Sequence, residues 1–247
     1  MSDAGAGAAA VDAAAIGANF AGVHARIARA AEAAGREPAS VRLIAVTKTK
    51  PIAAVIAALA AGQQLFGENY AQELKEKCDA LGSAAATPGA PEWHFLGALQ
   101  GNKAKLVVGR AALVHTCDRL SLAQELNKQA AKAATGAPGF VQRVLLEVNL
   151  GREPQKGGCH PEALPELLRE VFALPGLRCE GLMCIPPAEG DPRGWFRALR
   201  TLRDQALQGG LGPLPVLSMG MSADFEQAIA EGATLVRVGT AIFGARA

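Results

Sequence analysis

Long hydrophobic runs, paired cysteines and aromatic residues are all scarce in this sequence of 247 residues, and each shortage excludes a class of protein. No apolar stretch approaches the roughly 20 residues needed to cross a bilayer, so no membrane partner is expected. The five cysteines are scattered without a CxxC pair, which argues against a disulfide framework or a structural zinc site. Aromatic residues make up only 4% of the chain, the net charge is +2 and no basic face is clustered, so nucleic-acid binding is not expected.

The first residues are small and weakly charged, without the basic start and strong apolar centre of a secretory signal. This predicts a cytoplasmic protein in which residues 1–10 are flexible. The length allows either two small domains or one α/β barrel, because about 250 residues is typical of such a barrel. No domain boundary is visible, so we interpret residues 1–247 as a single domain.

Helical and strand-like segments alternate along the chain. A long leading helix, extra to the repeat that follows, is predicted over residues 11–35 from apolar residues at helical spacing. Eight short apolar runs after it are interpreted as strands: residues 42–47, 64–66, 93–96, 113–116, 144–149, 180–185, 216–218 and 235–238. Segments of helical composition separate them, at residues 52–61, 71–81, 103–109, 120–135, 162–174, 195–208 and 225–231. This alternation predicts a parallel sheet, and eight strands favour a closed (β/α)8 TIM barrel over a doubly wound open sheet.

Polar residues follow the ends of the predicted strands, which is where a parallel barrel gathers its functional groups. Lys48 follows the first strand immediately before a predicted helix, whereas its neighbour Lys50 is expected to be a solvated surface charge. Asn69 is equally consistent with a helix cap, and His94, which lies between two aromatic residues in a strand, with a buried core histidine. Lys48 is therefore the strongest single candidate for chemistry.

The last two strand and loop units predict an anion site beside an arginine. Ser222 follows a glycine turn and can cap the next helix, whose exposed N–H groups attract anions. Gly239 and Thr240 follow the final strand and can present further backbone donors. Arg237 lies within that apolar strand, and because a buried guanidinium without a partner is costly, it should face a ligand or a carboxylate. A lysine at the first strand's exit, facing these groups, predicts a Schiff base with a phosphorylated aldehyde.

With these residues in place, the chain resembles the YggS-like family, the pyridoxal phosphate homeostasis proteins. The resemblance runs from residue 42 to residue 246 and rests on eight strings in family order: AVTKTKP, FGENYAQE, WHFLGALQGNK, VHTCDRL, VLLEVNLGREPQKGG, EGLMCIPP, LSMGMSADFEQAI and VRVGTAIFGAR. It implies a barrel like the N-terminal domain of alanine racemase, with pyridoxal 5′-phosphate bound as an internal aldimine.

The resemblance also implies roles for particular residues. Lys48 occupies the Schiff-base position, and Arg237 faces the pyridine nitrogen. The residues that hold the phosphate are Ser222, Gly239 and Thr240. Those that line the rest of the pocket are Asn69, His94 and Met219. Lys156 occupies a family lysine position whose role, including that of a second attachment point, stays open.

Two kinds of function remain open on these residues. A protonated arginine at the pyridine nitrogen weakens the electron sink that amino-acid chemistry requires, which favours a carrier without catalytic residues of its own. As the resemblance implies, such a carrier takes part in pyridoxal phosphate homeostasis, supplies apoenzymes, and affects amino-acid and keto-acid balance indirectly. The alternatives are a minimal racemase, whose second base would be His94 or Tyr70, and a Schiff-base aldolase acting on a sugar phosphate. A monomer is expected, because nothing replaces the second domain through which racemases dimerise.

Overall fold

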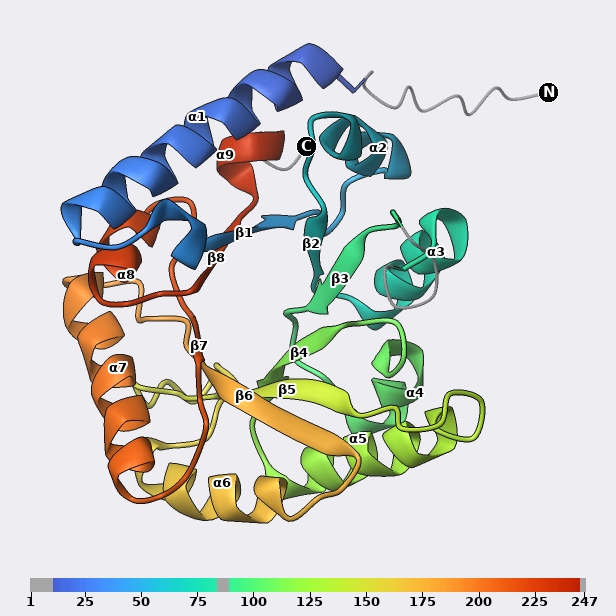
Figure 1. Cartoon of the computed structure of the whole chain (residues 1–247), viewed down its shortest axis with the longest axis vertical. Helices are drawn as coiled ribbons and strands as arrows, with labels where there is room; N and C mark the ends of the chain where they lie inside the picture. The colour runs from blue at the N-terminus through green and yellow to red at the C-terminus, as the bar shows by residue number, and fades with distance from the viewer. Residues whose placement is uncertain (1–10, 84–88, 245–247) are drawn as a thin grey trace.

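The computed structural model describes residues 11–83 and 89–244, and its centre is a closed barrel of parallel strands (Figure 1). The strands are β1 (Arg42–Val46), β2 (Leu65–Glu68), β3 (Glu92–Phe95), β4 (Leu113–Cys117), β5 (Gln142–Glu147), β6 (Leu177–Met183), β7 (Val216–Ser218) and β8 (Leu235–Val238). Each strand pairs with the next, and β1 pairs with β8 to close the ring, with Ile44 opposite Arg237. The predicted eight-stranded barrel is confirmed. The predicted flexibility of residues 1–10 lies outside the described residues.

Helices follow each strand and form a ring around the barrel, all but the last of them leading to the next strand (Figure 1). They are α2 (Ile52–Ala60), α3 (Ala71–Leu81), α4 (Ala104–Val107), α5 (Leu120–Ala133), α6 (Leu164–Phe172), α7 (Pro192–Gln208), α8 (Phe225–Ala230) and α9 (Thr240–Phe243). Short 3-10 helices accompany them at η1 (Pro38–Ser40), η2 (Gly101–Lys103) and η3 (Pro161–Ala163). In the described part of the chain, none of the helices combines the length and the apolar character that a bilayer crossing requires.

The leading helix, α1 (Ala13–Ala33), packs across the outside of α2, α8 and α9 (Figure 1). Asp12 caps its start by accepting a hydrogen bond from the Ala15 N–H at 2.9 Å. Gly35 ends it with a φ of +67°, a conformation that glycine adopts without strain. The buried stripe that contacts the barrel's outer ring consists of Ile16, Phe20, Val23, Ile27 and Ala31. The predicted leading helix is therefore confirmed.

The hydrophobic core has two parts, because side chains alternate between the two faces of each strand. The larger part lies between the strands and the helices and contains Trp93, Phe95, Phe196 and Phe225. The smaller part lies inside the barrel and consists of Ile44, Leu65, Leu96, Leu113, Leu145, Met183 and Leu235. The remaining interior positions of the barrel include buried polar residues.

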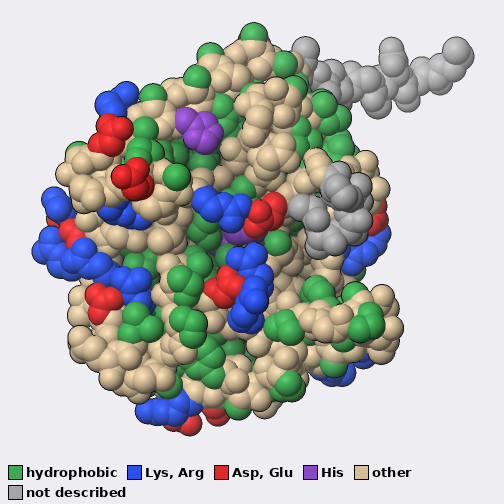
Figure 2. All heavy atoms as spheres, viewed as in Figure 1, with side chains coloured by type: hydrophobic (Ala, Val, Ile, Leu, Met, Phe, Trp, Pro, Cys, Tyr) green, Lys and Arg blue, Asp and Glu red, His purple; other side chains and the backbone are tan. Residues whose placement is uncertain are grey.

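Three strands begin earlier than the hydrophobic pattern predicts: β3 starts at residue 92 instead of 93, β5 at residue 142 instead of 144, and β6 at residue 177 instead of 180. The added positions include Arg143 and Arg178, whose charges are atypical of a strand in a barrel. Both pair with Glu180, at 2.7 Å from Arg143 Nη2 to Glu180 Oε2 and 2.7 Å from Arg178 Nε to Glu180 Oε1. Figure 2 is viewed from the N-terminal end of the barrel. It shows basic and acidic side chains together over the middle of this end.

Candidate functional site

A cavity of about 360 Å³ opens at the C-terminal end of the barrel. Its volume falls in the range of about 300–1,000 Å³ that is usual for small-molecule sites. Six of the eight residues predicted to bind a cofactor lie in its lining: Lys48, Asn69, Ser222, Arg237, Gly239 and Thr240. The other lining residues are Val46, Lys50, Leu96, Ile185, Met221, Ala223 and Gly244. The barrel therefore brings the amine, the guanidinium and the hydroxyls of the predicted site to one cavity.

Lys48 lies on the turn that follows β1, and this turn is held on both sides. Thr47 is fully buried, and its hydroxyl donates to Glu68 Oε1 at 2.5 Å. Thr49 has a φ of +61°, which is uncommon for a residue other than glycine, and its N–H donates to Glu73 Oε2 at 2.8 Å. These contacts restrain the backbone before and after Lys48 and so restrict where its side chain can enter the cavity.

A buried ion pair supports the same turn. Lys77 Nζ donates to the Thr47 carbonyl and to Glu68 Oε1, both at 2.7 Å. Burial raises the pKa of Glu68, while the charge and hydrogen bond of Lys77 act in the opposite direction. The sequence alone did not predict this lysine, because lysines on helices normally reach solvent. Its only signal is its place on the buried stripe of α3, between Leu74 and Cys78.

Lys50 is not the solvated surface charge that we predicted. It lines the cavity, and its Nζ donates to the carbonyl oxygen of Phe243 at 3.0 Å. Phe243 ends α9, so this contact joins the loop after the first strand to the helix after the last. Closure of the barrel creates the contact, and no local pattern near residue 50 indicates it.

The loops after β7 and β8 meet at one corner of the cavity. Thr240 Oγ1 and Ser222 Oγ are hydrogen-bonded at 3.2 Å. Gly239, directly after β8, packs closely against the end of β1: a Cβ there would lie only 3.3 Å from the carbonyl oxygen of Val46. Two hydroxyls beside closely packed backbone form a polar corner that can donate hydrogen bonds to an anion.

The helix predicted over residues 225–231 begins at Phe225 as expected, but Ser222 does not cap it. In the structure α8 starts at Phe225, and the Asp224 carboxylate accepts a hydrogen bond from the Met221 N–H at 2.6 Å. Gly220 makes the preceding turn with a φ of +91°, and a Cβ there would lie 2.9 Å from the Phe225 Cα. Ser222 therefore stays on the loop, where its hydroxyl is free of a capping role and contacts the next loop.

Arg237 is the most deeply placed polar residue of the cavity, at 5% exposure. Its Nη1 donates to Ser218 Oγ at 2.7 Å, and its Nη2 donates to the Cys184 carbonyl at 2.9 Å. Both acceptors are uncharged, and the residues that the structure describes form no ion pair with this guanidinium. Burial lowers the pKa of Arg237. A buried cation with neutral acceptors only is costly, which points to a ligand in the cavity as its further partner.

Asn69 carries an unpartnered atom at the same cavity. Its Oδ1 is buried and has no hydrogen-bond partner in the described part of the chain. Buried polar atoms are rarely left without a partner, so an unmatched one in a cavity lining calls for an explanation. A ligand that brings a hydrogen-bond donor would satisfy it.

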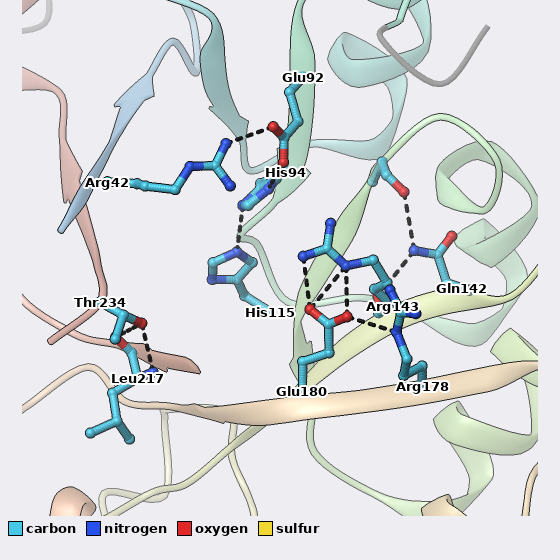
Figure 3. Close-up of polar contacts among 11 residues, drawn as sticks. Arg42, Glu92, His94, His115, Gln142, Arg143, Arg178, Glu180, Leu217 and Thr234 are labelled. Atoms are coloured by element: carbon cyan, nitrogen blue, oxygen red, sulfur yellow. Dashed lines mark hydrogen bonds and ion pairs between the residues drawn. The ribbon is translucent and has the colours of Figure 1, made fainter. Parts of the chain in front are cut away.

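His94 does not line the cavity. It is fully buried within the barrel, with its Nδ1 at 2.9 Å from His115 Nε2 and its Nε2 at 3.1 Å from Glu92 Oε1 (Figure 3). The structure thus favours the alternative of a core histidine with satisfied hydrogen bonds. The hydrophobic pattern of the sequence does not predict these hydrogen bonds, because they join residues of different strands.

Met219 also lies outside the cavity lining. It is fully buried in the core between strands and helices. Ser218 before it points to Arg237, and since side chains alternate along a strand, Met219 points outward. Met221, two residues later, is 38% exposed and reaches the cavity instead.

Two other residues named from the sequence are also outside the lining. Tyr70 is 54% exposed, next to Asn69 but directed elsewhere. Lys156 Nζ donates to the Pro186 carbonyl at 2.9 Å and pairs with Glu153. Neither contributes to the cavity.

Comparison with known proteins shows the family and the fold to which this chain is similar. The family model for the alanine racemase N-terminal domain matches residues 12–247. A protein of Pseudomonas aeruginosa named pyridoxal phosphate homeostasis protein is 49% identical over 229 residues, covering 92% of this chain and 94% of that protein.

Two solved structures are similar as well. PipY of Synechococcus elongatus, solved with PLP bound, has a TM-score of 0.78 at 35% identity, covering 93% of this chain and 100% of that one. An alanine racemase of Corynebacterium glutamicum has a TM-score of 0.70 at 17% identity, covering 96% of this chain and 62% of that one. The second likeness concerns the fold alone.

Proposed function

This chain belongs to the family of pyridoxal phosphate homeostasis proteins, and we propose that it binds pyridoxal 5′-phosphate covalently at Lys48 and acts in the homeostasis of that cofactor. When bound, this cofactor supplies an aldehyde for an amine and a ring that withdraws electrons. The chain's own residues would bind and orient it. The relative that was solved with PLP bound supports the choice of cofactor.

One observation carries the assignment of residues. An amine, a buried guanidinium with uncharged hydrogen-bond partners and a pair of hydroxyls line the same cavity, although they lie almost 200 positions apart in the sequence. These groups complement an aldehyde, an aromatic ring nitrogen and a phosphate respectively. Lys48 would hold the aldehyde carbon, Arg237 would face the ring nitrogen, and the corner of Ser222, Gly239 and Thr240 would hold the phosphate. Asn69 would accept a hydrogen bond through its unpartnered oxygen.

The cavity favours a carrier over a catalyst. Arg237 is a cation and does not supply the carboxylate that would stabilise a protonated ring nitrogen. The two side chains considered as a second base for a racemase, His94 and Tyr70, both lie outside the cavity lining. A sugar-phosphate aldolase would use the same lysine, but the family relationship favours the cofactor as the occupant.

Delivery of the cofactor to apoenzymes is part of the proposal, and so are a monomeric state and a place in the cytoplasm. The cavity opens at the end of the barrel, where an acceptor protein could approach the bound group.

The test is an absorption spectrum of the purified protein loaded with pyridoxal 5′-phosphate, followed by borohydride reduction and mass spectrometry. We expect a visible band, and a pyridoxyl group on Lys48 after reduction. Lys48→Ala should lose both, whereas Lys156→Ala, which changes a lysine outside the cavity, should keep both. A reduced group found on another lysine, or a band that persists in Lys48→Ala, would overturn the assignment.

A further inference from the structure

A chain of hydrogen bonds crosses the inside of the barrel and ends at Arg237. It begins at the N-terminal end of β3, where Glu92 Oε1 lies 3.1 Å from His94 Nε2. His94 Nδ1 lies 2.9 Å from His115 Nε2, and His115 Nδ1 lies 2.9 Å from Ser218 Oγ. The last step joins Ser218 Oγ to Arg237 Nη1 at 2.7 Å. Figure 3 shows Glu92, His94 and His115 in line across the barrel.

The interior members of this chain are shielded from water. His94, His115 and Ser218 are all fully buried, and Arg237 is 5% exposed. Buried donors and acceptors are normally satisfied by partners, so each of these side chains must find its partner among the other members of the hydrogen-bond chain. The chain therefore has few alternative arrangements.

The donors and acceptors allow only one direction along the chain. Arg237 can only donate, so the Ser218 oxygen accepts from it, and the Ser218 hydrogen is left to be donated to His115 Nδ1. A neutral His115 then carries its hydrogen on Nε2 and donates it to His94 Nδ1. A neutral His94 in turn donates from Nε2 to the Glu92 carboxylate.

The opposite direction fails at both ends. It would leave the Ser218 hydrogen without an acceptor in the chain, and it would place the lone pair of His94 Nε2 against a carboxylate oxygen of Glu92. Burial lowers the pKa of both histidines, which keeps them neutral. The hydrogen bond from His94 lowers the pKa of Glu92 to about 2, which keeps that carboxylate charged.

We propose that Ser218, His115, His94 and Glu92 are positioning residues that hold Arg237 in place for the cofactor ring, with Glu92 as the remote anionic anchor. This inference rests on the proposed function. It identifies a remote carboxylate that is connected to the buried guanidinium through hydrogen bonds: Glu92, at the opposite end of the barrel and four hydrogen bonds away. Arg42 Nη2, at 2.6 Å from Glu92 Oε2, holds the anchor from the other side.

Release of the bound cofactor tests the near end of the chain. Ser218→Ala removes the only hydroxyl between Arg237 and His115, so we expect release about tenfold faster, the usual effect of losing one hydrogen bond to a charged group. Ser218→Thr keeps a hydroxyl and should restore release toward the wild-type rate. Equal release from the wild type and Ser218→Ala, or no recovery in Ser218→Thr, would overturn the proposal.

The far end has a matched control. Glu92→Gln keeps an acceptor for His94 but removes the charge, and we expect release to become about threefold faster, as for a partly preserved hydrogen bond. Glu180→Gln is the matched control, because it removes a carboxylate from the same end of the barrel that pairs with Arg143 and Arg178 and is not part of the hydrogen-bond chain. This substitution should leave cofactor release unchanged. Equal effects of the two substitutions would contradict the assignment of Glu92 as the anchor.

Nitrogen NMR of the histidine side chains in the full-length protein without cofactor tests the direction of the chain. We expect both His94 and His115 to be neutral with hydrogen on Nε2. A hydrogen on Nδ1 of either residue would overturn the direction. This measurement does not depend on cofactor binding, so a protein that bound no cofactor would contradict the proposed function while the spectrum still decided the direction of the hydrogen bonds.

Discussion

Lys77 Nζ lies 2.7 Å from Glu68 Oε1 and 2.7 Å from the carbonyl oxygen of Thr47, the residue before Lys48. Both side chains of this ion pair are almost completely buried. The pair thus connects helix α3 to the backbone that presents Lys48, and it ties the stability of the fold to the geometry of the cavity.

Lys77→Met is expected to lower the free energy of unfolding by about 3–5 kcal/mol at pH 7, because it leaves Glu68 buried without its counter-charge. Urea unfolding followed by circular dichroism measures this. Lys75→Met is the matched control on the same helix, since Lys75 forms an exposed pair with Asp79 and such pairs contribute about 1 kcal/mol or less. Similar losses in the two variants would show that the buried pair contributes no more to the free energy of unfolding than the exposed pair.

Glu147 is predicted to make stability depend on pH. It is 6% exposed at the end of β5, and burial, aided by the charge of Asp118, raises its pKa to about 7. The folded state therefore binds this proton more tightly than the unfolded state, so stability falls as the pH rises from about 4.5 to about 7 and then levels off.

Glu147→Gln removes this titration. We expect the variant to be more stable than the wild type above pH 7, by at most about 3 kcal/mol, and similar to it below pH 4.5, where Glu147 is protonated in both states. Thermal unfolding across this pH range gives the comparison. A difference between the two proteins that stays constant with pH would contradict the raised pKa.

The corner formed by Ser222 and Thr240 is predicted to select for the phosphate. Replacing Ser222 with alanine and Thr240 with valine removes two donors, and hydrogen bonds to charged groups contribute about 1.5–3 kcal/mol each. We expect the double variant to bind pyridoxal 5′-phosphate at least about tenfold more weakly. Pyridoxal, which lacks the phosphate, should bind both proteins equally, and titration by absorbance measures both ligands. An equal loss for the two ligands would place the phosphate elsewhere.

Gly220 is predicted to be essential for the turn that carries Ser222. At its φ of +91° a Cβ would lie 2.6 Å from the Cβ of Ala228, so alanine there suffers both backbone strain and a clash. Gly62 has nearly the same φ, +88°, with no atom within 4 Å of its Cβ position. Gly62→Ala should therefore lose about 1–2 kcal/mol from backbone strain alone.

Gly220→Ala is expected to lose clearly more than Gly62→Ala in urea unfolding and also to weaken binding of the phosphate-bearing ligand. Because the two glycines share a backbone conformation, the difference between the variants isolates the clash with the helix. Equal losses would mean that α8 moves away at no cost.

Much of the fold could be predicted because the signals for it are local. Each strand of the barrel is a short apolar run, and each helix a periodic one, so their order and number were readable. The predictions were wrong where a residue's role depends on a partner from another strand. Arg143 in β5 pairs with Glu180 in β6, and His94 is a core residue because His115 and Glu92 are its hydrogen-bond partners.

The same distinction holds at the cavity. Positions just after strand ends, such as Lys48, Asn69 and Thr240, were identified because a parallel barrel collects all strand ends on one side. Met219 lies outside the cavity lining and Met221 within it, which the sequence did not indicate, because the turn at Gly220 changes which side chain faces the cavity. Lys50 and Lys77 were missed because the carbonyl groups that hold them belong to other elements.

By itself the sequence determined the number and order of the strands, the leading helix and the set of polar residues at the strand ends, since these depend on hydrophobic periodicity and on turn residues close together in the chain. Only the tertiary structure decided which of those residues share one cavity and which buried charges find partners. The physical reason is that closure of β1 against β8 brings residues 48 and 237 together, and a buried polar group is stable only beside a partner that the fold supplies.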